Sequence, residues 1–115
     1  MTLIYKICSN AEWAEAEASG SYSGSEHDWR DGFIHFSTAS QLPGTLAKHY
    51  ASRTDLLLIA VDPEMLGDAL RWEPARDGDL FPHLYDELPI AAALWTQALK
   101  IGSTGDHILP AEAMR

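Results

Sequence analysis

Apolar residues occur along this chain in short runs, and their spacing predicts a mixture of strands and helices. Residues 3–8 form a run rich in strand-forming side chains, and residues 56–61 are apolar at every position. A strand without polar positions is typical of the middle of a sheet that is covered on both faces. We therefore expect 56–61 to be the central strand, with Asp62 and Pro63 ending it.

Two helices are predicted from the signals that begin and end them. Ser9 and Glu12 have the spacing of a capping box, and Gly20 can end the first helix in the left-handed conformation. Apolar residues recur at helical spacing within 42–50, and a hydroxyl side chain among residues 37–40 can cap that second helix. The first helix is expected to follow directly on the first strand.

Further strands are expected at four places and loops at two. The expected strands cover residues 33–36, 69–73, 90–99 and 107–110. The run 90–99 alone also fits a helix, and Pro89 before it favours the strand. Loops are expected at 21–31, which is polar, and at 81–85. Together these elements predict one α+β domain over residues 1–115, with a mixed or antiparallel sheet and two main helices.

The bulk composition is that of a small globular protein. A chain of 115 residues with 46% hydrophobic and 22% charged residues can bury a core without metal or disulfide. The single cysteine, Cys8, lies in an apolar run and fits a reducing compartment. Neither a signal peptide nor an apolar run of membrane-spanning length occurs, so we expect a cytoplasmic protein without a membrane partner.

The net charge of −9 argues against duplex nucleic acid as a partner, because the phosphate backbone would be repelled. A small phosphorylated ligand remains compatible with this charge, since single arginines can bind phosphate locally. The arginines that could do so are Arg30, Arg53, Arg71 and Arg76. The sequence alone does not show whether they converge.

The segment GFIHFST, residues 32–38, is the first candidate functional segment. In an extended conformation His35 and Ser37 point to the same side, and the helix that follows begins with free N–H groups. These groups suit a sugar hydroxyl or a phosphate oxygen, and Thr38 and Gln41 lie close enough to contribute to binding. The alternative is a core histidine whose ring nitrogens are satisfied by the backbone.

The segment FPHLY, residues 81–85, is the second candidate. His83 can carry a proton near neutral pH, while Tyr85, with Phe81 beside it, can stack on a planar ligand. The alternative is a hydrophobic plug that closes the core. Glu73 follows a tryptophan, so we predict either a base whose pKa is raised by desolvation or a solvated edge charge.

Metal binding and the common nucleotide motifs are not indicated by local spacing. The five histidines, at positions 27, 35, 49, 83 and 107, form no HxH or HExxH pattern, so no metal site is expected. The GxGxxG, GxxxxGK[ST] and GxSxG patterns do not occur either. Cys8 in an apolar strand is a poor candidate for a nucleophile.

These segments, in this order, resemble a family of small bacterial proteins known as domain of unknown function 952. The resemblance runs from residues 4–7 through Trp13, GFIHFST with Gln41, the apolar run 56–61, Trp72-Glu73 and FPHLY. It implies the ADP-ribosyltransferase-like fold, in which a curved, split sheet grips nicotinamide dinucleotide (NAD) or a related nucleotide.

The resemblance also implies roles for individual residues. His35 would contact a ribose hydroxyl, Tyr85 or Tyr50 would stack on the nicotinamide, and Glu73 would act as the acidic residue. The chain departs from the transferase pattern, because it has no Glu-x-Glu or Gln-x-Glu loop and carries the second histidine His83. Protein ADP-ribosyl transfer is therefore less expected than hydrolysis or transfer on a small nucleotide.

Two functional hypotheses follow from the sequence. The first is an enzyme acting on NAD or an ADP-ribose-type nucleotide, and the second is a noncatalytic module that binds a nucleotide or small metabolite. The expected catalytic residues are His35, His83 and Glu73. The expected ligand-binding residues are Ser37, Thr38, Gln41, Phe81 and Tyr85.

Overall fold

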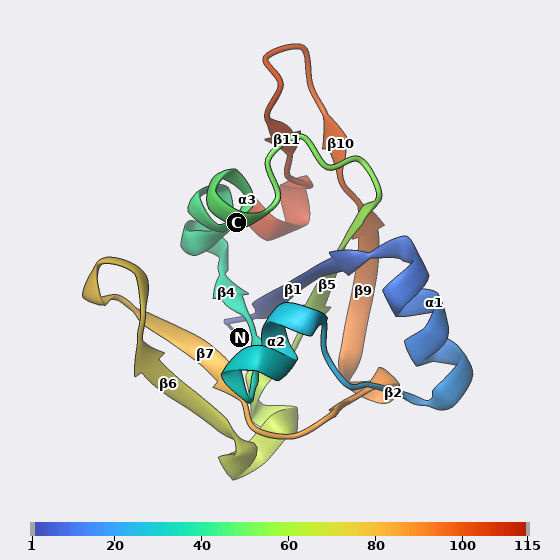
Figure 1. Ribbon diagram of the computed structural model, residues 1–115, viewed down its shortest axis with the longest axis vertical. Helices are drawn as coiled ribbons and strands as arrows, with labels where there is room; N and C mark the ends of the chain where they lie inside the picture. Colours follow the sequence, from blue (N-terminus) through green and yellow to red (C-terminus); the bar gives the residue numbers. More distant parts are fainter. Residues whose placement is uncertain (1, 115) are drawn as a thin grey trace.

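The central sheet forms from the two apolar runs of the sequence. In the computed structural model β1 (Ile4–Ser9) pairs antiparallel along its whole length with β5 (Leu56–Val61). β9 (Ala93–Ala98) pairs with the other edge of β5, and β4 (Ser37–Thr38) pairs with β1. The order is therefore β4-β1-β5-β9, as Figure 1 shows, and the prediction that β5 is a central strand is confirmed.

The structure describes residues 2–114, and both faces of its central sheet are covered. On one face Ile4 and Cys8 of β1 pack in a core with side chains of α1 (Asn10–Ser19). On the other face the alternate β1 residues pack in a second core with side chains of α3 (Leu42–His49). Lys6, also buried, lies in the strand between Ile4 and Cys8 and so points toward the first core.

Helix α1 begins and ends where its sequence signals predict. Ser9 Oγ accepts from the N–H of Glu12 at 3.1 Å, and the Ser9 N–H donates to the Glu12 carboxylate at 2.9 Å. Gly20 ends the helix with φ +98°, a conformation that glycine adopts without steric cost. The predicted capping box and glycine cap are both confirmed.

The polar segment 21–31 is not a loop, and that expectation was wrong. It contains β2 (Ser21–Tyr22), which pairs with β8 (Leu88–Pro89), and the short helix α2 (Glu26–Asp31). Ser25 and Asp28 form a second capping box that begins α2. The helix was missed because Trp29 is its only apolar residue, so that it shows no apolar periodicity, although the Ser-x-x-Asp spacing was present.

The segment 81–85 is not a loop either. Its first four residues belong to β7 (Leu80–Leu84), which lies between β3 (Ile34–His35) and β6 (Leu70–Pro74) in a three-stranded antiparallel sheet. Pro82 has no N–H to donate, which usually confines proline to edge strands and bulges. Its carbonyl nevertheless accepts from the N–H of Phe36 at 3.0 Å, so the strand continues through it.

The remaining elements are a hairpin and several short turns. β10 (Lys100–Ile101) and β11 (His107–Ile108) form the hairpin at the top of Figure 1. Short 3₁₀ turns occupy Ala39–Gln41, Pro63–Ala69, Arg76–Gly78, Ile90–Ala92 and Ala111–Met114. The predicted strand over 90–99 is thus confirmed only from β9 onward, and a strand at the end of the chain is confirmed by β11.

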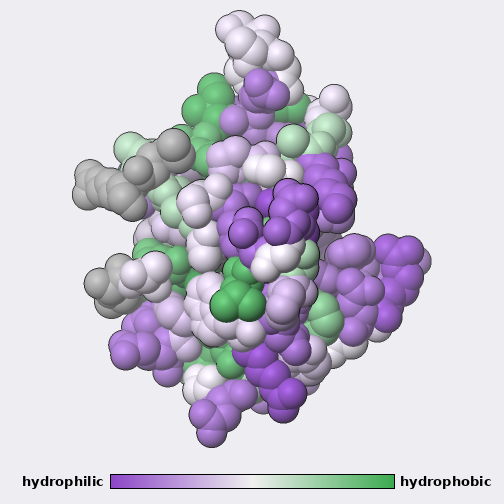
Figure 2. All heavy atoms as spheres, turned by 90° about the vertical axis from the view of Figure 1, so that its left-hand side faces the viewer, coloured by the Kyte–Doolittle hydropathy of each residue, from purple (hydrophilic) through white to green (hydrophobic). Residues whose placement is uncertain are grey.

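The chain is an α+β domain in which all strand pairs of the described residues are antiparallel. Figure 2 looks onto the side that carries α3 and the turn between β6 and β7, and it shows mostly hydrophilic residues with small hydrophobic patches. Over residues 2–114, none of the helices has the length and apolar character needed to cross a membrane.

Candidate functional site

A cavity of about 260 Å³ is lined by residues of β1, α2, α3 and the segment that runs from β3 into β4. In that segment Phe36 packs in the core, whereas the alternate residues His35 and Ser37 line the cavity. His27 of α2 and His49 of α3 line it as well. We call this cavity the histidine pocket.

A larger hollow of about 520 Å³ lies between α3 and the β10–β11 hairpin, but its lining offers less chemistry. Most of its residues are apolar, and the Nε2 atom of His107 is already 2.7 Å from the carbonyl oxygen of Arg53. The histidine pocket combines histidines, carboxylates, cations and hydroxyls, so it is the better candidate for a functional site.

A buried ion pair forms the floor of the histidine pocket. The Lys6 ammonium donates to both carboxylate oxygens of Asp28, at 2.9 and 3.1 Å, and to the carbonyl oxygen of His35 at 3.1 Å. Both side chains of the pair are 2% exposed. The three protons of the ammonium therefore each have an acceptor, which is the condition under which a charge tolerates burial.

Asp28 also fixes the position of the neighbouring strand. Its carboxylate accepts from the N–H groups of Ser25 and His35, at 2.8 and 3.1 Å, and lies 2.6 Å from Nδ1 of the His35 ring. Burial raises the pKa of Asp28, but the His35 hydrogen bond, the Lys6 ammonium and the Ser25 N–H outweigh it. The pKa of this carboxyl therefore lies well below its usual range, and the group is ionised.

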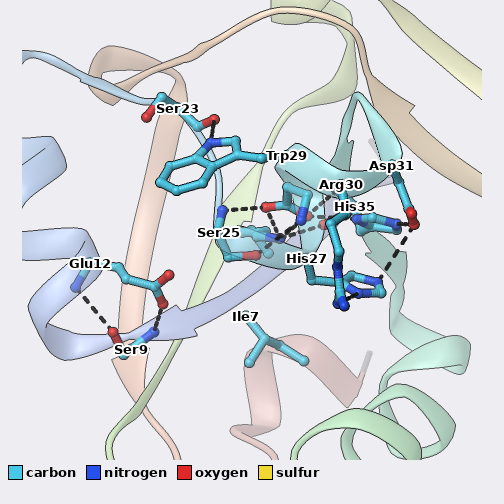
Figure 3. Close-up of polar contacts among 12 residues, drawn as sticks. Ile7, Ser9, Glu12, Ser23, Ser25, His27, Trp29, Arg30, Asp31 and His35 are labelled. Atoms are coloured by element: carbon cyan, nitrogen blue, oxygen red, sulfur yellow. Dashed lines mark hydrogen bonds and ion pairs between the residues drawn. The ribbon is translucent and has the colours of Figure 1, made fainter.

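His35 lies between two carboxylates. Besides the contact with Asp28, its Nε2 atom is 2.8 Å from Oδ2 of Asp31. Carboxylates only accept hydrogen bonds, so both contacts are satisfied as hydrogen bonds only when both ring nitrogens carry a proton. Figure 3 shows Asp31 joined by dashed lines to the rings of both His35 and His27.

Three histidine rings gather at the mouth of the pocket. The ring centre of His27 lies 4.4 Å from that of His35 and 5.4 Å from that of His49. Burial and the neighbouring His35 lower the pKa of His27, and burial and the neighbouring His27 lower the pKa of His49. Both of these rings are therefore mainly neutral at pH 7.

The histidine pocket also carries cations and hydroxyls. Lys48 and Arg76 line it together with Ser37 and Thr45, whose hydroxyl oxygens are 2.9 Å apart. The Arg76 guanidinium donates to Thr45 Oγ1 at 3.4 Å and lies 4.9 Å from the centre of the Phe81 ring. Of the four arginines noted in the sequence, Arg76 lines this pocket.

The predicted site residues separate into two groups. His35, Ser37 and Phe81 line the histidine pocket. Gln41 instead connects backbone groups, because its side chain accepts from the N–H of Thr38 at 3.0 Å and donates to the carbonyl oxygen of Leu80 at 2.8 Å. Neither Thr38 nor Gln41 lines the pocket.

Tyr50, the alternative stacking residue, also lines the pocket, whereas His83, Glu73 and Tyr85 form a cluster beside it, on or next to the three-stranded sheet. His83 pairs with His35 across the strands, but its ring is buried and stacks on Phe33, with the ring centres 4.0 Å apart. Nδ1 of His83 lies 2.9 Å from Glu73, which also accepts from the Tyr85 hydroxyl at 2.7 Å. His83, Glu73 and Tyr85 do not line the histidine pocket.

The prediction of a raised pKa for Glu73 was wrong. Hydrogen bonds from Tyr85 and His83 lower the pKa of this carboxyl below its ordinary value. The alternative that Glu73 is an edge charge fits better, because it lies on β6, an edge strand of its sheet. A carboxylate that is already ionised and doubly hydrogen-bonded is a weaker proton acceptor than one raised by desolvation.

Sequence interpretation missed the residues that organise the pocket. Lys6 was part of an apolar strand, and a lysine within such a run was the available signal of a buried charge. Asp28 and Asp31 lay in the segment expected to be a loop, and His27 was considered only for metal motifs. Their convergence depends on α2 packing beside β3, which no local pattern specifies.

Comparison with solved structures shows that the fold of this chain is shared by a relative. The crystal structure of protein CC0527 from Caulobacter crescentus is 41% identical, with a TM-score of 0.94 over 99% of this chain and 100% of that chain. The solution NMR structure of CC0527 is 44% identical, with a TM-score of 0.83 over 92% of this chain and 91% of that chain.

The search of curated proteins found no match to the chain. Residues 7–96 match the family described as "Protein of unknown function (DUF952)". That range begins within β1 and ends within β9, and it includes every residue that lines the histidine pocket except Tyr5 and Lys6. The chain therefore belongs to the DUF952 family.

Proposed function

We propose that the histidine pocket binds a phosphorylated small molecule of the nucleotide type. The observation that carries this proposal is the convergence of Lys48 and Arg76 with the hydroxyls of Ser37 and Thr45 in a chain of net charge −9. Cations that gather in a cavity of an acidic protein attract an anion selectively, and an arginine fork matches a phosphate oxygen pair. The phosphate lies at this end of the pocket.

The other end of the pocket suits the sugar of a nucleotide. Asp31 and the histidine rings offer acceptors and donors to ribose hydroxyls. The volume of about 260 Å³ is below the range of about 300–1,000 Å³ that is usual for drug-sized ligands. The pocket therefore takes a phosphoribosyl group, and the base or second nucleotide extends along the surface.

NAD and ADP-ribose are the first compounds to test. The ADP-ribosyltransferase-like fold that the family resemblance implies is supported by two antiparallel sheets that one short segment, residues 34–38, connects. His35 lies on that connecting segment and lines the pocket, where a ribose contact was expected. NAD and ADP-ribose each contain the phosphoribosyl group for which the pocket has the right size.

Calorimetric titration tests the binding proposal. NAD, ADP-ribose, AMP and ribose 5-phosphate are titrated into the wild type and into Arg76→Gln and Lys48→Met. Loss of one charged contact weakens binding by about tenfold or more, equivalent to about 1.4 kcal/mol. Arg71→Gln and Lys100→Met are the matched controls, because Arg71 and Lys100 are exposed and lie outside the pocket.

Two results would overturn the binding proposal. One is the absence of measurable binding by all four phosphorylated compounds at millimolar concentration. The other is equal affinity of Arg76→Gln, Lys48→Met and the controls.

Catalysis on the bound nucleotide is a second candidate function, and one contact favours it. Asp28 holds Nδ1 of His35 at 2.6 Å, an arrangement that orients an imidazole for proton transfer or charge stabilisation at its other nitrogen. Nicotinamide release from NAD should then require His35 and survive His83→Ala, because His83 does not line the pocket. Equal loss in both variants, or no release by the wild type, would reject this candidate.

A further inference from the structure

We propose that His27, Asp31 and His35 form a binding site for a divalent transition-metal ion at the mouth of the histidine pocket. One ligand atom from each of these residues lies within 4.8 Å of the other two. Nε2 of His35 is 2.8 Å, and Nε2 of His27 is 3.8 Å, from Oδ2 of Asp31. This site does not depend on the proposal of phosphate binding, because neither Lys48 nor Arg76, the cations expected to bind phosphate, contributes to it.

The spacing of the ligand atoms fits a zinc-like ion. Metal–nitrogen and metal–oxygen bonds of about 2.0–2.2 Å at tetrahedral angles separate neighbouring ligand atoms by roughly 3.4 Å. The two observed separations, 2.8 and 3.8 Å, lie on either side of that value. Rotations of side chains that are half exposed are sufficient to reach it, since the His27 and Asp31 side chains are 44% and 45% exposed.

Local structure explains how three residues, each four positions after the last, converge on one point. His27 and Asp31 are i and i+4 on α2 and so lie on the same side of the helix. Gly32 ends the helix with φ +86°, and the chain turns back so that His35 on β3 lies against the same side. The pattern H-x₃-D-x₃-H brings its three side chains together only because of that turn. The motifs HxH and HExxH do not include this pattern.

The buried ion pair supplies the second requirement of a metal site. Metal-binding histidines commonly donate the N–H of their other ring nitrogen to a carboxylate, which fixes the tautomer and the ring orientation. Nδ1 of His35 makes this contact with Asp28, whose own position is fixed by Lys6 and two backbone N–H groups. Nε2 of His35 is thereby directed toward Asp31, where a metal ion replaces a proton.

One neighbouring contact must change when the metal binds. Arg30 lies with Nη2 3.2 Å from Nδ1 of His27 and can only donate, so Nε2 of His27 carries the proton in that neutral tautomer. Metal binding at Nε2 moves the proton to Nδ1 and releases Arg30 toward solvent. Arg30 is exposed, so the loss of this hydrogen bond costs little.

The ligand set leaves coordination positions open toward the pocket. Three protein ligands of the His₂-carboxylate type are typical of metal sites that also bind water or a substrate atom. His49, whose ring centre is 5.4 Å from that of His27, is the neighbouring side chain able to approach a fourth position. Imidazole and carboxylate ligands together favour Zn²⁺, Co²⁺ or Ni²⁺ over Ca²⁺ and Mg²⁺.

Titration of the untagged protein with metal ions alone tests the site. Zn²⁺ measured by calorimetry against a competing chelator should bind at one ion per chain, and Co²⁺ should give the visible absorption of a nitrogen-coordinated ion. His27→Ala and Asp31→Ala should weaken Zn²⁺ binding by tenfold to a hundredfold and abolish the Co²⁺ band. Arg30→Gln should keep or increase the affinity, because it frees Nδ1 of His27.

Two variants make the result specific. His107→Ala removes a histidine outside the site and should leave metal binding unchanged. Arg76→Gln impairs the phosphate end and should also leave it unchanged, so this proposal and the nucleotide proposal fail separately. Absence of stoichiometric Zn²⁺ binding, or wild-type affinity in His27→Ala with the fold intact, would overturn the metal site. Circular dichroism of each variant verifies that the fold is intact.

Discussion

Replacement of Lys6 by methionine tests the role of the buried ion pair most directly. The two side chains have similar length, so Lys6→Met removes the ammonium without leaving a large cavity. The ammonium donates to Asp28 twice and to the His35 carbonyl oxygen once. The variant therefore leaves a buried carboxylate without its counter-charge.

The expected loss of stability follows from the burial of the pair. Removing one partner of a buried ion pair costs about 3–5 kcal/mol. Asp28 keeps the N–H groups of Ser25 and His35 and the His35 ring, so a value near the lower limit, about 3 kcal/mol, is expected. A chain of 115 residues has a total stability of roughly 6–17 kcal/mol, so this loss is a large fraction.

Denaturant unfolding monitored by tryptophan fluorescence measures this loss. In thermal unfolding, a loss of 1 kcal/mol lowers the melting temperature of a chain of this size by about 4 °C, so the melting temperature of Lys6→Met should fall by about 12 °C. Lys100→Met changes an exposed lysine and should stay within about 0.5 kcal/mol of the wild type. In Lys6→Met/Asp28→Asn the two losses should not add, because the uncompensated charge is gone. A change below about 0.5 kcal/mol in Lys6→Met would refute the argument.

Three further predictions concern other parts of the structure. Burial raises the pKa of the Cys8 thiol from 9.0 to about 12. The stability that the neutral thiol contributes is therefore complete below pH 9 and is lost as pH rises from 9 toward 12. Unfolding free energies measured at pH 8–11 should fall more steeply for the wild type than for Cys8→Ala. Gly24→Ala should lower the melting temperature more than Gly20→Ala. Both glycines have positive φ, but only at Gly24 would a β-carbon lie 2.9 Å from the buried side chain of Asp28. Equal losses in the two variants would show that this contact is unimportant. Gly44→Ala should weaken nucleotide binding with little loss of stability, because its β-carbon would come within 2.9 Å of the Arg76 guanidinium and displace it. An unchanged affinity in calorimetry would contradict this.

The elements that local signals specify were predictable. The capping box of Ser9 and Glu12 and the glycine at position 20 give the bounds of α1, and the apolar run of β5 indicates a strand covered on both faces. In each case the information lies within a few neighbouring residues. Helix α2 was predictable in principle from Ser25 and Asp28, but its polar composition concealed it.

The arrangement of the candidate site was not predictable from local pattern. His35 and His83 are 48 positions apart and become neighbours only through the pairing of β3 with β7. Lys6 and Asp28 are separated by 22 positions, so the partner that permits burial of a lysine cannot be identified from its own strand. The sequence therefore placed His35 and Ser37 on one side of an extended segment and included Phe81 among the binding residues, but it did not indicate that Lys6, Asp28 and Asp31 share their pocket.

Chemical shift mapping with ADP-ribose tests the central claim, that the histidine pocket is the ligand-binding site. Amide resonances of isotopically labelled protein are followed during the titration. The largest changes are predicted for His35, Lys48 and Arg76, which surround the pocket. Changes concentrated at His107 and Leu109 in the larger hollow, or no changes at millimolar ligand, would contradict the account.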